Sequence, residues 1–151
     1  TDRKTAEVFY DNYFKEFPSI RGYLDGVKDF AKRLGYTTTL FGRRRYFPML
    51  RSPLPFIRAT GERMAINAPI QGSAADIIKQ AMLNVQSALV AGKYTSRLLL
   101  QVHDELILEV VTKEIDEVSE LVRVEMGKAY PLRAPLDVSV GIGKSWNDAA
   151  H

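Results

Sequence analysis

The chain has 151 residues, 46% apolar and 26% charged, which is typical of a globular domain large enough to bury a core and excludes general disorder. The absence of cysteine excludes disulfides, thiol catalysis and cysteine-ligated zinc, and no apolar run approaches the roughly 18 residues of a membrane-spanning helix. The net charge of +3 divides into +6 over residues 1–75 and −3 over residues 76–151, so a polyanionic partner is expected mainly for the first half.

Two amphipathic helices are predicted at the start of the chain. The first covers residues 4–17 and has an aromatic face, which we interpret as core rather than as a platform for stacked bases. Pro18 and Ser19 open the second, with Ser19 as its cap, and Gly35 ends it. Because the helical pattern is already present at Thr1, which is not a methionine, we expect the chain to be a piece of a longer protein.

Residues 36–75 form the most basic part of the chain. They contain one acidic residue, Glu62, no lysine, and six arginines: Arg43, Arg44, Arg45, Arg51, Arg58 and Arg63. Residues 36–40 favour a strand, and Gly42 begins a turn that presents the first three arginines. Arginine binds phosphate in a bidentate manner, so this turn is a candidate contact for a nucleic-acid backbone, with a solvated basic loop as the alternative. Three prolines then predict an irregular loop over residues 47–56.

The longest predicted helix runs from about Arg58 to Ala91. Its expected buried stripe consists of Ile66, Ile70, Ala74, Ile77, Ala81, Val85 and Leu89. Pro69 should kink this helix or mark its true start. Arg63, Asn67 and Gln71 are spaced by four and therefore form one row of hydrogen-bond donors, unless they only bond neighbouring backbone. The small residues that follow, from Gly72 to Ala75, allow close approach of a ligand or another backbone.

The segment LLLQVHDELILEV, residues 98–110, places three ionisable side chains inside an apolar run. It predicts a hairpin of two buried strands joined by a tight turn at His103 and Asp104. Asp104 and Glu105 are adjacent carboxylates that repel each other, so a nearby cation would stabilise them. Their hard oxygen atoms suit Mg²⁺. The alternative is an ordinary exposed acidic turn.

The end of the chain predicts a helix and a strand. Residues 112–129 show a helical period, with Val118 and Val122 among the inward positions and Glu114 among the outward ones. Residues 136–142 alternate apolar and polar side chains, which predicts a strand that pairs with the hairpin.

A row of donors that precedes a metal-compatible hairpin suits template-directed polymerisation. The minor groove offers similar acceptors at every base pair, so arginine and amide donors there check pair geometry without reading sequence. Carboxylate-bound metal ions activate a primer hydroxyl and neutralise phosphates during an in-line displacement.

Four segments carry a resemblance to the C-terminal end of family A DNA polymerases, the DNA polymerase I type: TLFGRRRYFP, ERMAINAPIQGSAADIIKQAM, LLLQVHDELILEV and VGIGKSW. The resemblance covers essentially the whole chain. It implies an α+β fold in which residues 1–57 are the last part of the fingers and residues 58–151 the C-terminal part of the palm. It also implies a long palm helix, an antiparallel hairpin, a further helix and a C-terminal strand.

The resemblance implies a role for each candidate site residue. Asp104 resembles the metal-binding catalytic aspartate, Glu105 its less essential neighbour, and His103 the residue beside the primer terminus. Arg63, Asn67 and Gln71 resemble the minor-groove donors. The basic turn, Arg43, Arg44 and Arg45, resembles a turn that contacts phosphate or packs within the fingers. The departure of RSPLPFIRATGERM from the usual family loop leaves no role assigned to Arg51 or Arg58.

The implied reaction is metal-dependent addition of deoxynucleotides to a primer, in DNA replication and repair. The implied partners are primer-template DNA, deoxynucleoside triphosphates and the remainder of the polymerase chain, with no membrane, in a cytoplasmic location. A two-metal Mg²⁺ site would need the other catalytic aspartate, and triphosphate binding would need a lysine, both upstream of this chain. We therefore expect the 151-residue chain alone to be inactive.

Two other function classes would use parts of the same residue set. A non-catalytic nucleic-acid-binding module would use the arginines and the donor row without needing Asp104. A metallohydrolase built on His103, Asp104 and Glu105 is disfavoured, because three adjacent residues on a tight turn do not easily converge on one ion, and the other histidine is His151.

Overall fold

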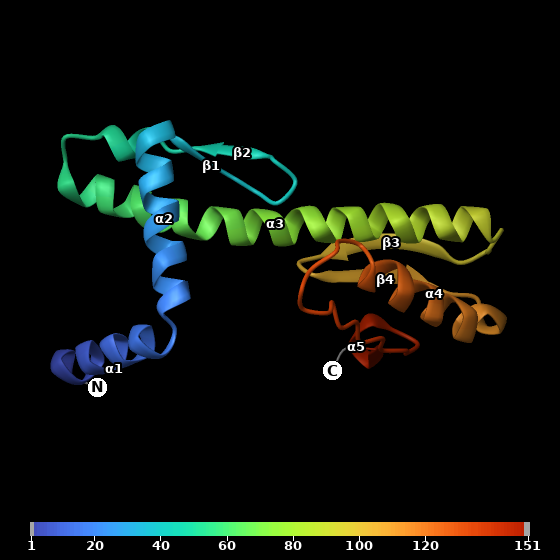
Figure 1. Ribbon diagram of the computed structural model, residues 1–151. Coiled ribbons are helices and arrows are strands. Elements are labelled where there is room, and N and C mark those ends of the chain that lie inside the picture. The colour runs from blue at the N-terminus through green and yellow to red at the C-terminus, as the bar shows by residue number, and fades with distance from the viewer. Residues whose placement is uncertain (1, 150–151) are drawn as a thin grey trace. The chain divides into compact units, whose positions relative to one another are not determined.

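The computed structural model describes residues 2–149, and these form two compact units that divide between Ser73 and Ala74. Each unit combines helices with one short antiparallel strand pair (Figure 1). This composition confirms the predicted α+β class. No helix of residues 2–149 has the length and apolar character needed to cross a membrane.

The first unit begins with helices α1 (Arg3–Glu16) and α2 (Pro18–Leu34). Pro18 occupies the first turn of α2, and no side chain caps this helix, so the predicted cap at Ser19 was wrong. Gly35 ends α2 with φ of 80°, a left-handed conformation that glycine adopts without steric cost, as predicted.

The aromatic face of α1 is exposed rather than buried. No residue of α1 is buried, and Phe9 keeps 76% of its accessible surface. The rings instead pack on one another, with the Tyr10 and Phe14 centroids 4.7 Å apart. The prediction that this aromatic face belongs to the core is therefore wrong for residues 2–149.

Strands β1 (Tyr36–Thr38) and β2 (Arg44–Tyr46) pair in antiparallel register, with Tyr36 opposite Tyr46. The first strand was predicted, but the second was not, because residues 43–45 were assigned to a turn. Gly42, with φ of 80°, instead lies in the connection that precedes β2.

After β2, the short 3₁₀ helix η1 (Pro48–Arg51) leads to α3 (Pro55–Ala91), which continues through Pro69 (Figure 1). Pro69 therefore does not mark the start of this helix. The core of the first unit consists of Ala31, Phe47, Ala65 and Ala68. The predicted stripe was wrong in this half of α3, since Ile70 is 57% exposed.

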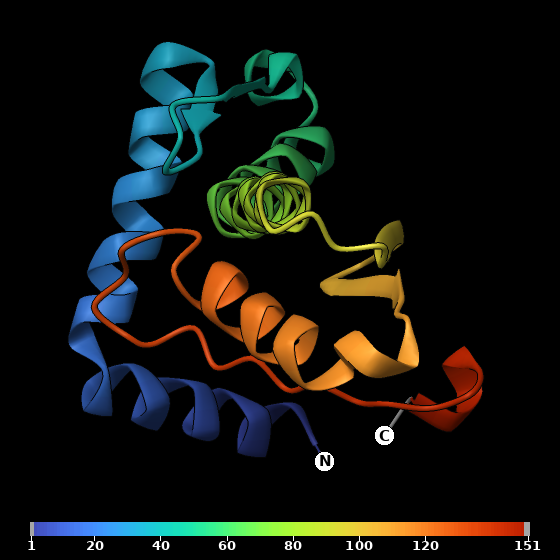
Figure 2. The same ribbon diagram turned by 90° about the vertical axis from the view of Figure 1, so that its right-hand side faces the viewer.

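The second unit is built on the C-terminal half of α3. Strands β3 (Arg97–Val102) and β4 (Glu105–Glu109) form the hairpin. The 3₁₀ helix η2 (Thr112–Glu114) and helix α4 (Ile115–Gly127) follow (Figures 1 and 2). Its core consists of Val85, Leu89, Val118 and Val122, with apolar side chains of β4 packed against them. Here the predicted inward positions are confirmed from Ala81 onward in α3 and at Val118 and Val122 in α4, whereas Ala74, also predicted to face inward, is exposed.

Two predictions for the second unit were wrong. The hairpin strands are not fully buried, because Leu99 and Leu100 are 51% and 47% exposed and a register shift lies between Leu98 and Leu100. Residues 136–142 form no strand, although burial still alternates over residues 136–141. A strand needs a partner for its backbone hydrogen bonds, and no strand among residues 2–149 pairs with this segment. The short helix α5 (Trp146–Ala149) follows.

Candidate active site

The hairpin tip brings the three predicted catalytic residues together. Val102 lies opposite Glu105, so His103 and Asp104 form a two-residue turn, as predicted. All three ionisable side chains of the tip are exposed to solvent. This placement leaves the carboxylates of Asp104 and Glu105 accessible to a substrate or an ion.

The backbone of the turn has an uncommon conformation. His103 has φ of 53°, in the left-handed region that residues with a side chain rarely adopt. Two-residue hairpin turns require positive φ at their first position, which explains the value. The carbonyl oxygen of His103 accepts a hydrogen bond from Nε2 of Gln101, a residue that sequence reasoning did not select.

The donor set at the tip fits a partial Mg²⁺ site. Asp104 and Glu105 supply hard oxygen atoms, and Mg²⁺ commonly takes one or two protein carboxylates together with waters and substrate phosphates. Over residues 2–149, no three His, Cys, Asp or Glu side chains are placed so that they could hold one metal ion together. The three-residue metal site of the metallohydrolase interpretation, built on His103, Asp104 and Glu105, is therefore not found among these residues. His151, the other histidine in that interpretation, lies outside the described residues.

The open end of the hairpin is fastened by Glu114. Its carboxylate accepts hydrogen bonds from the backbone N–H groups of Thr95 and Ser96 and, at 2.6 Å, from the Ser96 hydroxyl. The same hydroxyl oxygen accepts from the N–H of Val111, at 3.0 Å. Ser96 precedes β3 and Val111 follows β4, so one carboxylate holds both ends of the hairpin. The helical period had predicted an outward Glu114, which was wrong.

We expect Glu114→Gln to loosen the base of the hairpin. The hydroxyl of Ser96, followed by the N–H groups, lowers the pKa of Glu114. The carboxylate therefore stabilises the fold above the pKa it would have when unfolded, about 4.3. Amide hydrogen exchange at Thr95 and Ser96 should be faster in the variant at pH 7. The difference should shrink as the pH falls through the lowered pKa and the native carboxylate is protonated.

Asp116→Asn is the matched control, because Asp116 is an exposed carboxylate two residues further along. It should leave exchange at Thr95 and Ser96 nearly unchanged. Equal protection in native protein and Glu114→Gln at pH 7 would show that the carboxylate does not fasten the hairpin.

The predicted donor row lies on α3 within the first unit. Arg63, Asn67 and Gln71 are all exposed, as a row that faces a ligand requires. Arg63 donates from Nη2 to the hydroxyl oxygen of Thr60, at 3.0 Å. Within the part of the chain that the structure describes, the amides of Asn67 and Gln71 have no hydrogen-bond partner. The alternative in which these amides bond neighbouring backbone therefore finds no support here.

The three arginines of the predicted basic turn, of which Arg44 and Arg45 lie in β2, are used partly for packing. The guanidinium of Arg44 lies 4.7 Å from the centroid of the Tyr36 ring, and that of Arg45 lies 5.5 Å from the Phe47 ring. Both side chains remain exposed, as does that of Arg43. Stacking on a ring leaves the guanidinium N–H groups at its edge available for an anion.

The connection between β1 and β2 is docked on the small residues of α3. The Ser73 hydroxyl accepts from the N–H of Leu40, at 2.9 Å. A Cβ at Gly72 would come within 2.7 Å of the Thr39 side chain. The small residues predicted to allow close approach therefore receive part of this chain. Arg58 also has a structural role, since it donates to the carbonyl oxygens of Ser52 and Pro53.

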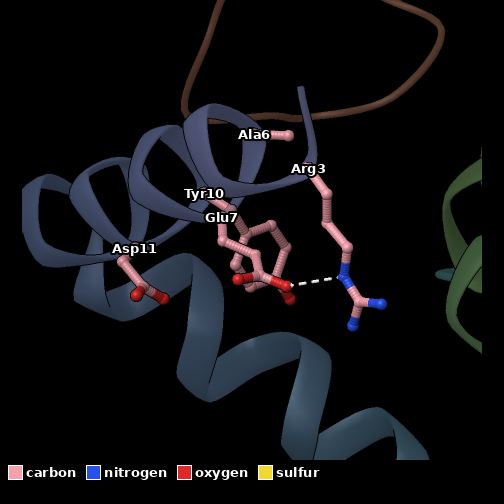
Figure 3. A pocket seen from close by; sticks show the side chains of 5 residues that line it. All are labelled: Arg3, Ala6, Glu7, Tyr10 and Asp11. Carbon is pink, nitrogen blue, oxygen red and sulfur yellow. Dashed lines mark hydrogen bonds and ion pairs between the residues drawn. The ribbon is translucent and has the colours of Figure 1, made fainter. Parts of the chain in front are cut away.

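A surface hollow of about 480 Å³ lies on α1 and contains none of the predicted site residues (Figure 3). Its lining consists of Arg3, Ala6, Glu7, Tyr10 and Asp11, all from this one helix. Arg3 and Glu7 form an ion pair across it, with 2.9 Å between Nε and Oε1. An open hollow on a single helix lacks the convergent polar groups of a ligand site.

Comparison with known proteins gives extensive similarity to DNA polymerase I. The chain is 53% identical to DNA polymerase I of Mycobacterium leprae over 146 residues, which are 97% of the chain and 16% of the relative. It is 47% identical to the Bacillus caldotenax enzyme and 45% identical to the thermostable enzyme of Thermus filiformis. These matches cover 97% and 98% of the chain, and 17% and 18% of the relatives. The chain thus spans less than a fifth of the length of these relatives.

A solved structure shares the fold. The POL domain of Pol1 from M. smegmatis, in complex with DNA primer-template and dNTP, matches with a TM-score of 0.95 and 53% identity. The match covers 99% of this chain and 26% of that one. The family model described as DNA polymerase family A matches residues 1–148. The chain therefore belongs to DNA polymerase family A.

Proposed function

We propose that this chain supplies the metal-binding hairpin and the minor-groove donors of a DNA-directed DNA polymerase. The reaction is the template-directed addition of deoxynucleotides to a primer 3′ end, in DNA replication and repair. The observation that carries the proposal is the exposed pair of carboxylates, Asp104 and Glu105, at the tip of a two-residue hairpin turn. Membership of the family and the similarity to a polymerase domain solved with DNA primer-template and dNTP support it.

Each residue of the tip has a distinct role in the proposal. Asp104 holds Mg²⁺, Glu105 contributes less to the same ion, and His103 lies against the primer terminus. Bound Mg²⁺ would supply Lewis-acid activation of the primer hydroxyl and neutralise phosphate charge. The two carboxylates provide part of a two-metal site, and the remainder of the polymerase chain completes it.

The first unit contributes contacts to the DNA. Arg63, Asn67 and Gln71 donate to minor-groove acceptors, and the basic turn contacts phosphate through guanidinium edges. In the terms of the family, residues 1–57 are the end of the fingers and residues 58–151 are palm. The compact units divide at Ser73 rather than at residue 57, because α3 belongs to both. We place the parent enzyme in the bacterial cytoplasm, as the named relatives are bacterial.

The 151-residue chain alone should not extend a primer. Two adjacent carboxylates cannot hold two metal ions without further ligands, so the chain should bind Mg²⁺ weakly and show no template-dependent incorporation. The test is a primer-extension assay with Mg²⁺ on the purified chain, beside an intact polymerase that contains it. Template-dependent extension by the chain alone would refute the proposal that the metal site is shared between this chain and the remainder of the polymerase.

A non-catalytic nucleic-acid-binding module is the second candidate, because the exposed arginines and amides would serve it equally well. It differs from the polymerase in having no need for Asp104. Substitution of that residue in the intact protein therefore separates the two candidates.

A further inference from the structure

Phe56 is an exposed aromatic residue in the first turn of α3, the helix that carries the proposed minor-groove donors. Its side chain keeps 68% of its accessible surface. Within the part of the chain that the structure describes, its ring takes part in no ring–ring or cation–π contact. Single exposed apolar residues are common on protein surfaces, so the position of this ring on the helix decides what it means.

The ring continues the donor row along one face of α3. Phe56 lies seven residues before Arg63, and Asn67 and Gln71 follow Arg63 at intervals of four. Seven residues are close to two helical turns, so the ring and the Arg63 side chain share a face, about 10 Å apart along the helix axis. All four residues belong to the first unit. A nucleic-acid strand that continues along this face beyond the donors therefore reaches the ring.

Hydrogen bonds connect the backbone of Phe56 to the donor row. Nη2 of Arg63 donates to the hydroxyl oxygen of Thr60, and this hydroxyl donates to the carbonyl oxygen of Phe56, both at 3.0 Å. Arg58 fastens the loop before the helix, because its Nη1 donates to two carbonyl oxygens of that loop at 2.8 and 2.9 Å. The ring is therefore held on an ordered backbone, which reduces the entropy lost when a partner binds.

The charge around the ring favours a polyanionic partner. Residues 36–75 contain six arginines and one acidic residue, Glu62. That carboxylate is paired with Lys32, with 2.9 Å between Oε1 and Nζ. Positive grooves that carry exposed aromatic side chains bind single-stranded nucleic acid, because every base has a face that can stack on a ring.

The pairing state of the DNA decides which base the ring can reach. Inside a duplex, the faces of each base are covered by the neighbouring base pairs, so the ring can stack only on an unpaired base. Template-directed addition leaves the template strand unpaired ahead of the primer end. The unpaired template is thus the part of the substrate that offers free base faces next to the donor row.

We propose that Phe56 stacks on an unpaired base of the template strand, ahead of the base pair that the donor row checks. The ring holds the template and touches neither the primer terminus nor the reacting atoms. The proposal rests on the proposed function, because the unpaired template belongs to that reaction.

The test measures the Kd of primer-template for an intact polymerase that contains this chain, in the absence of nucleotide. The template has an unpaired overhang of about six nucleotides, and one abasic nucleotide, which keeps its phosphate but has no base, is moved along it. At one position the native protein should bind about 5- to 150-fold more weakly, the equivalent of one lost stacked base. Phe56→Leu, which is apolar but has no ring, should bind the unmodified template more weakly and lose little further affinity at that position.

Two further variants serve as controls. Phe56→Trp keeps an aromatic face and should keep the sensitivity to the abasic nucleotide. Leu54→Ala is the matched control, because Leu54 is an apolar residue two positions earlier that is 47% exposed and has no ring. It should keep both the native affinity and the native sensitivity.

Three results would overturn the proposal. The first is equal sensitivity to the abasic nucleotide in the native protein and in Phe56→Leu. The second is an equal loss of affinity in Phe56→Leu for templates with and without an overhang, which would place the ring on the duplex. The third is a native Kd in Phe56→Leu with a lowered Tm in Phe56→Ala, which would place the ring against the remainder of the polymerase chain. Failure of the proposed function is a separate result, because it is measured by incorporation in Asp104→Asn, whereas these binding measurements involve no incorporation.

Discussion

Replacement of Asp104 by asparagine in an intact polymerase should lower single-turnover nucleotide incorporation by several powers of ten. Removing one preorganised donor from a transition state typically costs about 10²- to 10³-fold. Loss of a charged metal ligand should cost more, because it would weaken a two-metal site whose ions would together stabilise the attacking and the leaving oxygen atoms. Asparagine keeps the shape of the side chain, so the hairpin turn should persist.

DNA affinity distinguishes loss of chemistry from loss of binding. The Kd for primer-template should change little in Asp104→Asn, since the proposed phosphate and minor-groove contacts lie on other residues. Glu105→Gln should give a smaller loss of rate, in keeping with its lesser role. Incorporation by Asp104→Asn within a few-fold of the native rate would remove the catalytic assignment and favour the nucleic-acid-binding module.

Glu109→Gln serves as the control on the same hairpin. Glu109 is an exposed carboxylate of β4 and pairs with Arg97, with 2.6 Å between Oε2 and Nε. Exposed ion pairs contribute about 1 kcal/mol or less to stability. This variant should therefore retain nearly the native rate, which would show that negative charge on the hairpin is not itself the requirement.

Local sequence rules were sufficient to predict the parts that carry the candidate site. The hairpin tip could be predicted from the spacing of the two apolar strands, because a connection of two residues specifies a tight hairpin turn. The donor row on α3 could be predicted from the helical period, because positions 63, 67 and 71 lie on one face of the helix regardless of how its other faces pack. Both features depend on backbone periodicity alone.

Burial depends on partners that periodicity does not specify. A Cβ at Gly61 would come within 2.8 Å of Met49, so η1 packs closely enough on α3 to require small residues there. Ala65 and Ala68 are buried in one cluster with Ala31 and Phe47, whereas Ile70 lies outside that cluster and is 57% exposed. Residues 136–142 are a second case in which the pattern was not sufficient. Alternation of apolar and polar residues predicts which side chains face inward, but it does not show whether another strand is available for pairing.

Hydrogen-bonding networks between distant residues were also beyond local rules. Glu114 lies 18 positions from Ser96, and nothing in its own helical period indicates that its carboxylate binds there. The hydrogen bond from Gln101 to the carbonyl oxygen of His103 was overlooked for a related reason, since it forms across a turn in which His103 has positive φ. Such a conformation is known only once the turn is seen.

The exposed amides of α3 provide the test that best separates a polymerase from a general DNA-binding protein. Asn67 and Gln71 are uncharged and have no hydrogen-bond partner among residues 2–149, so their loss should not disturb the fold. If they donate to minor-groove acceptors, alanine at either position should cost about 1–3 kcal/mol at a matched primer terminus. This corresponds to a loss of extension rate of roughly 5- to 150-fold.

The identity of the base pair should not alter the effect. Every base pair offers similar minor-groove acceptors, so the loss should be the same for each correct pair. Arg44→Ala, in the basic turn proposed to contact phosphate, should behave differently, because loss of a phosphate-binding charge weakens binding to all sequences and reduces the salt dependence by about one charge. Gln86→Ala, which removes an exposed glutamine elsewhere on α3, should have no effect on extension.

A mismatched terminus gives the decisive comparison. A mismatch displaces the acceptors from the donors, so the native enzyme already lacks these hydrogen bonds there. Asn67→Ala and Gln71→Ala should therefore slow extension of mismatched primers much less than that of matched primers, and discrimination against mismatch extension should fall. The measurement is single-turnover extension of both primers by each variant of the intact enzyme. Equal losses on the two primers would exclude a geometric check by these amides and leave them a role in packing or backbone binding.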